Sequence, residues 1–267
     1  MVIPRQGFRI AARGAVALLA GCGAFPADWS RTDADGLDAY KASFHRAVGD
    51  RVATTLDRSE LLARARAADV LWLGDHHRDV VLHDRWLRLI DDLADDVVPH
   101  RPVVLALECV GTADGPAIEA FLAGRLDLTE LRARIRERWP ESWLDGDQVD
   151  AAFYRDLLRL ARERGLGVCP LEPTPRLPLP ERDETMAATV RQLLTTDAAR
   201  PLVIAVVGQA HLLGDGDLVG RVGHTAVAVV ASAEGPLAAR LTELAATGPG
   251  ARFAVTERGI LAPIPTR

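Results

Sequence analysis

The stretches VLWLGDHH at residues 70–77 and VIAVVGQAH at residues 203–211 decide the expected fold of this chain. Each is an apolar run of strand length that breaks at a glycine and presents a histidine three residues later, His77 and His211. A third run, VVLALE, ends in the carboxylate of Glu108. Runs that are apolar throughout, rather than alternating, are typical of strands buried on both faces of a parallel sheet.

Short apolar runs and stretches of helical periodicity alternate along the rest of the chain. Besides the three runs above, strands are expected at residues 168–171, 225–231 and 253–256, the last as an edge strand. Helices are expected at residues 37–52, 59–67, 82–93, 117–123, 129–138, 147–164 and 184–194. Ser59 is the expected cap of the second helix, and the proline-rich segment 173–180 is expected to be a loop. This alternation predicts an α/β fold with a mostly parallel sheet and helices on both faces.

The N-terminus has the features of a targeting segment. Three arginines precede a short run of small and apolar residues, which is too short to span a bilayer as a helix. The run ends in LAGC, which resembles the lipobox of bacterial lipoprotein signal peptides and places the lipidated cysteine at Cys22. We therefore expect a signal peptide at residues 1–21, a flexible tether at 22–36 and a single domain at 37–267.

Composition narrows the range of functions. A formal net charge of −5 provides no basic surface of the kind that nucleic-acid binding needs, so we expect no nucleic-acid partner. Of the three cysteines, Cys22 lies in the leader, which leaves Cys109 and Cys169 in the domain. These two are interpreted either as free buried thiols or as a disulfide formed in an oxidising compartment.

The ends of the three apolar runs form the candidate site. In an open α/β sheet, ligands bind beyond the carboxyl ends of the strands, where His77, Glu108 and His211 are expected. Two imidazoles and one carboxylate suit Zn²⁺ with a bound water, or Fe²⁺ held by a two-histidine, one-carboxylate face. Alternatively, each histidine is a hydrogen-bonded loop residue and Glu108 caps a helix or pairs with an arginine.

Further residues are candidates for the same site. The neighbours that we expect to bind a cofactor are Asp75, His76, His83, Arg182, Asp183 and Tyr154. His83 either reaches back to the site or is a core histidine with satisfied hydrogen bonds. Arg182 and Asp183 either supply charge at a helix N-terminus or line the ligand pocket. Tyr154 and Trp143 either pack in the core or form an apolar wall for the ligand.

The order of these motifs resembles the ChaN lipoproteins, within the haem-binding, Tiki and erythromycin-esterase-like superfamily. The resemblance is carried by GDHH-x5-H at residues 74–83, the strand that ends in Glu108, RDxxMA at residues 182–187 and GQAH at residues 208–211. It covers roughly residues 68–230. The family usually has a glutamate where this chain has Asp75.

This resemblance implies a lipid-anchored protein of the bacterial cell envelope, at the outer membrane or the periplasmic face. Some members bind haem or iron, so the expected ligand is haem or another small molecule. The expected partners are a membrane and a second copy of the chain in a possible homodimer. The Tiki branch implies instead a metal-dependent hydrolase, with its roles on His77, His211 and Glu108. The implied cofactor is therefore haem or a divalent Fe, Zn or Mn ion.

Overall fold

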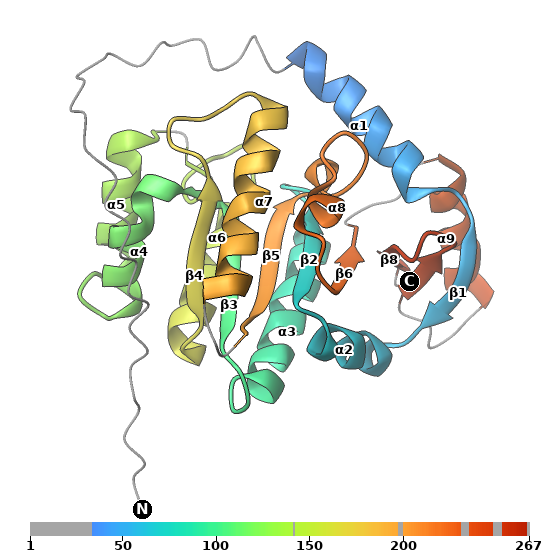
Figure 1. Ribbon diagram of the computed structural model, residues 1–267, viewed down its shortest axis with the longest axis horizontal. Coiled ribbons are helices and arrows are strands. Elements are labelled where there is room, and N and C mark those ends of the chain that lie inside the picture. Colours follow the sequence, from blue (N-terminus) through green and yellow to red (C-terminus); the bar gives the residue numbers. More distant parts are fainter. Residues whose placement is uncertain (1–33, 141, 197–199, 231–234, 248–252, 266–267) are drawn as a thin grey trace, which may run out of the picture.

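The computed structural model describes residues 34–140, 142–196, 200–230, 235–247 and 253–265 (Figure 1). Its strands are β1 (Val52–Leu56), β2 (Val70–Asp75), β3 (Val103–Gly111), β4 (Gly167–Glu172), β5 (Leu202–Gly208), β6 (Ala226–Val229), β7 (Phe253–Thr256) and β8 (Leu261–Pro263). Its α-helices are α1 (Ala34–Val48), α2 (Arg58–Ala67), α3 (Val80–Val97), α4 (Gly115–Leu122), α5 (Leu128–Arg138), α6 (Ala151–Arg164), α7 (Leu179–Thr196), α8 (Leu218–Val222) and α9 (Gly235–Thr247).

The strands form one eight-stranded sheet in the order β1-β7-β8-β6-β2-β5-β3-β4. Strands β6, β2, β5, β3 and β4 pair in parallel, and β7 pairs antiparallel with both β1 and β8. The three sequence runs therefore become neighbours, because β5 lies between β2 and β3. This arrangement confirms the expected α/β class and its mostly parallel sheet.

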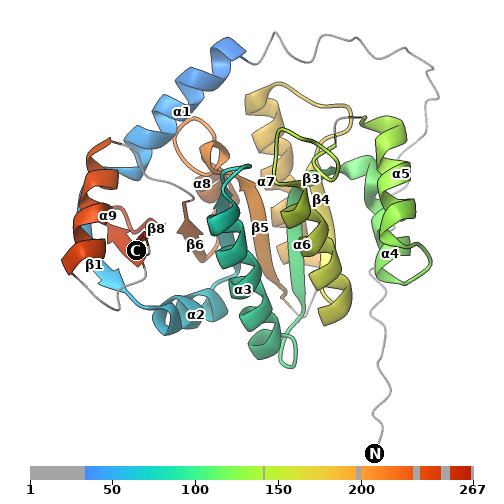
Figure 2. The same cartoon turned by 180° about the vertical axis from the view of Figure 1, so that it is seen from behind.

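Helices cover both faces of the sheet, and each face has its own apolar core. Figure 1 shows α7 and α8 on one face, and Figure 2 shows α3 and α6 on the other. Alternate residues of a strand point to opposite faces. In β2, Leu71 and Leu73 accordingly join the core beneath α3 and α6, while Val70 and Trp72 join the core beneath α7 and α8. Burial on both faces explains why these strands are apolar throughout.

Local signals explain where the helices begin. Helix α2 begins after Asp57, whose side chain accepts a hydrogen bond from the Glu60 amide, while the Glu60 side chain accepts one from the Asp57 amide. This reciprocal capping box satisfies two amides at once. The expectation that Ser59 caps the helix is therefore wrong, because Ser59 lies inside the first turn and its hydroxyl bonds to Asp57.

Several expected boundaries differ from the structure. Strands β1 and β8 were not expected, since β8 has only three residues and β1 is partly exposed and lacks a continuous apolar run. Strand β7 is not an edge strand because β1 and β8 flank it. Helix α7 begins at Leu179, inside the segment expected to be a loop. Proline is tolerated in a first turn, where its missing N–H has no helical partner to bind. Strand β3 continues past Glu108 to Gly111, so Glu108 lies within the strand and not beyond its end.

The proposed signal peptide, Cys22 and most of the tether lie outside the described residues. Within the described part of the chain, none of the helices combines the length and the apolar character needed to cross a bilayer.

Candidate functional site

The carboxyl ends of the central strands bring the three main candidate residues together around Gly208. A Cβ atom at Gly208 would lie 3.5 Å from Glu108 Oε2, 3.5 Å from His211 Cδ2 and 3.5 Å from His77 Cε1. Gly208 is aligned with Asp75 across the parallel β2–β5 pair. The structure therefore brings His77, Glu108 and His211 together near the carboxyl ends of these strands.

One half of the site faces α7 and is built on a buried ion-pair network. Glu108 pairs with the guanidinium of Arg182 through Oε1, and its Oε2 accepts a hydrogen bond from the Gly208 amide at 2.6 Å. Arg182 also contacts Glu172 Oε2 at 2.9 Å, so one buried cation bridges two buried carboxylates. Arg182 is 2% exposed although it is among the largest side chains of the protein. Its burial indicates a structural or functional role in the site and excludes a simple helix-terminal charge.

The two carboxylates bound by Arg182 titrate in opposite directions. Burial by itself would raise the pKa of Glu108, but Arg182, followed by His211 and His77, lowers it to about 2. Burial raises the pKa of Glu172 to about 7, because the attraction of Arg182 only partly offsets the desolvation of its charge. Arg176 also lies 3.4 Å from Glu172, but burial and the nearby charge of Glu108 outweigh both arginines, so Glu172 is the carboxylate that holds a proton more readily.

His211 completes this half of the site. Its Nδ1 atom lies 2.5 Å from Asp183 Oδ1, and its Nε2 atom lies 3.5 Å from Glu108 Oε1. The ring of Tyr40, from α1, meets the imidazole edge-on with centroids 5.8 Å apart. The buried hydroxyl of Tyr40 has no hydrogen-bond partner among the described residues. Asp183 thus orients His211 from α7, so this helix lies against the cluster.

The other half of the site faces α3 and α6 and is centred on Asp75. Its Oδ2 atom lies 2.9 Å from His77 Nδ1 and accepts a hydrogen bond from the Tyr154 hydroxyl at 2.5 Å. The His77 ring lies against Trp143, with centroids 4.2 Å apart, and its side chain is 39% exposed. Burial of Asp75 opposes ionisation, but hydrogen bonds from His77, His83 and Tyr154 lower its pKa well below the usual range.

His83 extends this half into the protein. It is buried in α3, with Nε2 2.8 Å from Asp75 Oδ1 and Nδ1 2.9 Å from Asp150 Oδ2. Asp150 is the N-cap of α6, and its amide donates to the carbonyl of His77 at 2.6 Å. His83 therefore both reaches back to the site and has satisfied hydrogen bonds, so the two alternatives drawn from the sequence are not exclusive.

His76 is the candidate that the fold does not bring into this network. Its side chain is exposed, whereas its neighbours Asp75 and His77 point into the cluster. The sequence reading missed Glu172, Asp150 and Tyr40. Glu172 had a signal, since like Glu108 it closes an apolar strand, and Asp150 precedes an amphipathic helix. Tyr40 had none, because only the packing of α1 brings it to His211.

The described residues include no group of three or more His, Cys, Asp or Glu side chains arranged to hold a metal ion. The reason lies in existing contacts, since Arg182 and an amide occupy the Glu108 oxygens and Asp183 occupies one nitrogen of His211. Cys109 and Cys169 are free thiols, so the alternative of a disulfide is not formed.

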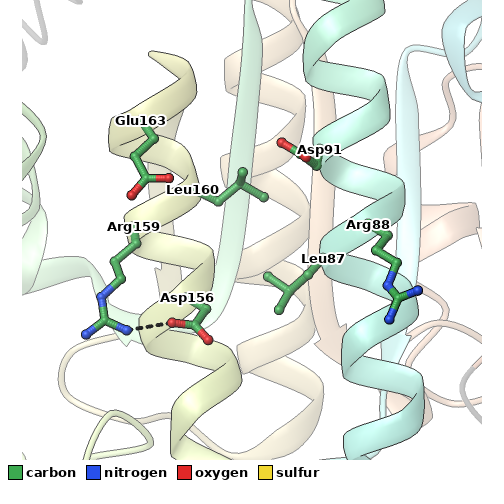
Figure 3. Close-up of a pocket in the computed structure, with 7 residues that line it drawn as sticks. All are labelled: Leu87, Arg88, Asp91, Asp156, Arg159, Leu160 and Glu163. Carbon is green, nitrogen blue, oxygen red and sulfur yellow. Dashed lines mark hydrogen bonds and ion pairs between the residues drawn. The ribbon is translucent and has the colours of Figure 1, made fainter.

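A surface groove of about 360 Å³ lies elsewhere, between α3 and α6. Figure 3 shows charged side chains around two leucines, Leu87 and Leu160, with Arg159 paired to Asp156. None of the lining residues belongs to the strand-end cluster. The groove is therefore separate from the candidate site.

Comparison with known proteins identifies one family. The family described as "Haem-binding uptake, Tiki superfamily, ChaN" matches residues 61–177. This range includes His77 and Glu108 but ends before Arg182 and His211. It confirms the resemblance drawn from the sequence motifs. No curated protein matches the chain.

Solved structures show a similar fold. "Cofacial heme binding to ChaN of Campylobacter jejuni" is 11% identical with a TM-score of 0.51, and the alignment covers 67% of this chain and 88% of that one. The type III effector HopBA1 is 14% identical, with a TM-score of 0.49 and coverage of 81% and 96%. A structure described as "Bacterial protein toxins" is 18% identical with a TM-score of 0.45, and this chain covers 39% of its length. At these identities the likeness concerns the fold alone.

Glu172→Gln tests the excess of buried negative charge. The raised pKa of Glu172 means that the folded state binds a proton that the unfolded state lacks between about pH 4.5 and pH 7. The stabilisation from the protonated form is complete below pH 4.5 and is lost as the pH rises through 7. Glutamine mimics the protonated form, so we expect the free energy of unfolding of the variant to exceed that of the wild type by about 1–3 kcal/mol at pH 8.

Urea unfolding at pH 4.5, 6 and 8 measures this difference. Glu184→Gln is the matched control, because Glu184 lies on α7 and pairs with arginines but is exposed. A Glu172→Gln variant that is less stable than the wild type at pH 8 would show that the Arg182–Glu172 pair outweighs the cost of burial.

Proposed function

Because the chain is a ChaN-like protein, we propose that it binds haem, or the iron that haem carries, at the carboxyl ends of β2, β3 and β5. The match of residues 61–177 to a haem-binding family is the observation that carries this proposal. The hydrogen bonds and the exposure of His77 also support haem binding at this place.

The surroundings of His77 suit an axial ligand of haem. Metal-bound histidines usually donate their second ring N–H to a carboxylate or carbonyl, which fixes the orientation of the ring and raises its basicity. Asp75 supplies such a carboxylate at His77 Nδ1, and Tyr154 holds the same carboxylate oxygen. Nε2 has no hydrogen-bond partner among the described residues. The adjacent Trp143 ring provides an aromatic surface beside a planar ligand.

The other candidates are less suited to binding a metal directly. Both oxygens of Glu108 are held by Arg182 and the Gly208 amide, and the Nδ1 atom of His211 is held by Asp183. Binding a divalent ion through all three residues would require Glu108 to leave a buried cation, at a cost of several kcal/mol. Haem brings its own equatorial nitrogens and needs only an axial ligand from the protein. Haem therefore fits this arrangement better than a bare divalent ion.

His77→Ala should weaken haem binding. We expect the dissociation constant to rise at least about tenfold, the factor typical of losing even an outer partner of a bound metal. Titration of haem into the purified domain, followed through its Soret absorbance, measures this change.

His76→Ala is the matched control, since it removes an adjacent but exposed imidazole that lies outside the cluster. Equal loss in both variants would indicate adsorption to surface histidines, and a wild-type domain without a Soret band would contradict haem binding altogether.

Lipid anchoring is the second part of the proposal, and its support is the lipobox-like LAGC that ends at Cys22. We propose that acylated Cys22 holds the domain on the bacterial cell envelope, because several acyl chains anchor a protein far more firmly than one. Cys22→Ser should shift the protein from the membrane fraction to the soluble fraction of bacterial cells. An immunoblot of the fractions measures this shift, and unchanged membrane association of the variant would refute lipidation.

A metal-dependent hydrolase is the second candidate function. One observation favours it: His77 and His211 each have Nδ1 on an aspartate, and both imidazoles lie beside Glu108 at Gly208. Two oriented imidazoles and a carboxylate are the side chains that hold a catalytic metal and transfer protons. A bound metal would lower the pKa of a water molecule and so supply a nucleophile.

Metal analysis separates the two candidates. If the chain is a hydrolase of this type, the purified protein should contain about one Zn or Mn per chain, and the double variant His77→Ala, His211→Ala should contain none. A metal-free wild type with a Soret band on haem titration would favour the haem-binding function and remove the hydrolase.

A further inference from the structure

A chain of four hydrogen-bonded side chains runs from the rim of the protein through its interior to His77. Asp150 Oδ2 lies 2.9 Å from His83 Nδ1, and His83 Nε2 lies 2.8 Å from Asp75 Oδ1. The other Asp75 oxygen lies 2.9 Å from His77 Nδ1. These contacts join the N-terminus of α6 to α3 and β2, which lie about 70 residues earlier in the sequence. The function proposed above uses His77 and Asp75 but assigns no role to His83 or Asp150.

The positions of the hydrogens in this row of side chains follow from the chemistry of the two carboxylates that flank His83. An ionised carboxylate can only accept hydrogen bonds, so each nitrogen of His83 must donate one. Both flanking carboxylates are stabilised as anions by further donors. Asp75 accepts from the Tyr154 hydroxyl, and Asp150 accepts from the Phe153 amide at the N-terminus of α6. His83 therefore carries two N–H groups and a positive charge.

The surroundings of His83 also favour its charged form. Phe153 stacks on the imidazole with centroids 3.9 Å apart and planes 5° from parallel, which suits the interaction of a cation with an aromatic face. Burial lowers the pKa of His83, but the hydrogen bonds to Asp75 and Asp150 outweigh burial and raise it. A buried cation between two carboxylates is paired on both sides, so its charge is not left uncompensated.

The charge on His83 determines what Asp75 can do for His77. Because His83 holds one Asp75 oxygen, the carboxylate stays ionised and its second oxygen faces His77 Nδ1. A hydrogen on Nδ1 is then required, since an unprotonated nitrogen would oppose the carboxylate lone pairs. The neutral His77 ring therefore carries its hydrogen on Nδ1 and its lone pair on Nε2. This tautomer is the one that binds a metal through Nε2.

We propose that His83 and Asp150 are positioning residues: His83 is a charged clamp between Asp150 and Asp75, and through Asp75 it fixes the tautomer and orientation of His77. Only one part of this proposal rests on the proposed function, namely that a ligand binds to His77 Nε2. The expected hydrogen positions on His83 and His77 are those of the ligand-free protein and do not depend on haem binding. Asp150 has an added effect, because its amide also holds the carbonyl of His77.

Long-range ¹H–¹⁵N NMR of the histidine side chains in the ligand-free protein tests the clamp directly. We expect both ring nitrogens of His83 to be protonated at pH 8 and His77 to be the Nδ1–H tautomer. A neutral His83 at pH 8, or a His77 with its hydrogen on Nε2, would overturn the proposal. This measurement needs no variant to fold and no haem to bind.

Variants then test the coupling between the two histidines. In His83→Gln, the amide oxygen faces one of the two carboxylates and repels it, so Asp75 is no longer held by a cation. We therefore expect His77 to become a mixture of tautomers and haem affinity to fall about tenfold. His76→Gln is the control and should leave the His77 signals unchanged. Asp150→Asn removes the charge and leaves one acceptor oxygen where the α6 cap and His83 use two, so it should lower the pH at which His83 loses its second proton.

The outcomes separate this clamp from the haem-binding function. His77 signals that are identical in wild type, His83→Gln and Asp150→Asn would refute the clamp even if haem still binds. Conversely, a wild type that shows the expected hydrogen positions and binds no haem would keep the clamp and refute the function proposed for the site. If His83→Gln does not fold, Asp150→Asn and the wild-type spectrum still decide the question.

Discussion

The parallel alignment of β2, β5 and β3 is the constraint on which the rest of the site depends. Parallel strands end at the same edge of a sheet, so side chains that follow three separate runs meet there. The register aligns Asp75 with Gly208, and the missing side chain of Gly208 leaves the place that three functional groups surround. A shift of one residue in β2 would turn Asp75 to the other face of the sheet. The apolar cores on both faces oppose such a shift, because each strand residue is matched to one of them.

The site has two halves because the sheet has two faces. Asp75 extends toward α3 and α6, where His83 and Tyr154 hold it. Glu108 extends toward α7, where Arg182 holds it. The two halves meet over the strand ends, with a half-exposed imidazole on one side and a buried carboxylate on the other. This asymmetry favours a ligand that is bound from outside through His77, with the Glu108 network as a rigid support.

Buried charge is costly, and the fold offsets that cost by connecting the charges. Two networks hold most of them: Asp75 and Asp150 around His83, and Glu108 and Glu172 around Arg182. Each places one cation between two carboxylates. In the Arg182 network, Glu108 also accepts from the Gly208 amide, and Glu172 lies 3.4 Å from Arg176 Nε at the rim. In the second, the proton uptake of Glu172 relieves the excess of negative charge. Ordered charges of this kind lower stability and preorganise a site, which is typical of functional centres.

The sequence by itself determined the α/β class, the central strands and the place of His77, Glu108 and His211. It could do so because burial on both faces makes a strand continuously apolar, and because a strand end is marked by the first glycine or polar residue that follows. It left open whether His83, Arg182 and Asp183 join the site. Only the tertiary structure decided this, since hydrogen bonds between β2, α3, α6 and α7 have no periodicity in the sequence. The same limit applies to short strands such as β1 and β8, which are strands only because a neighbour pairs with them.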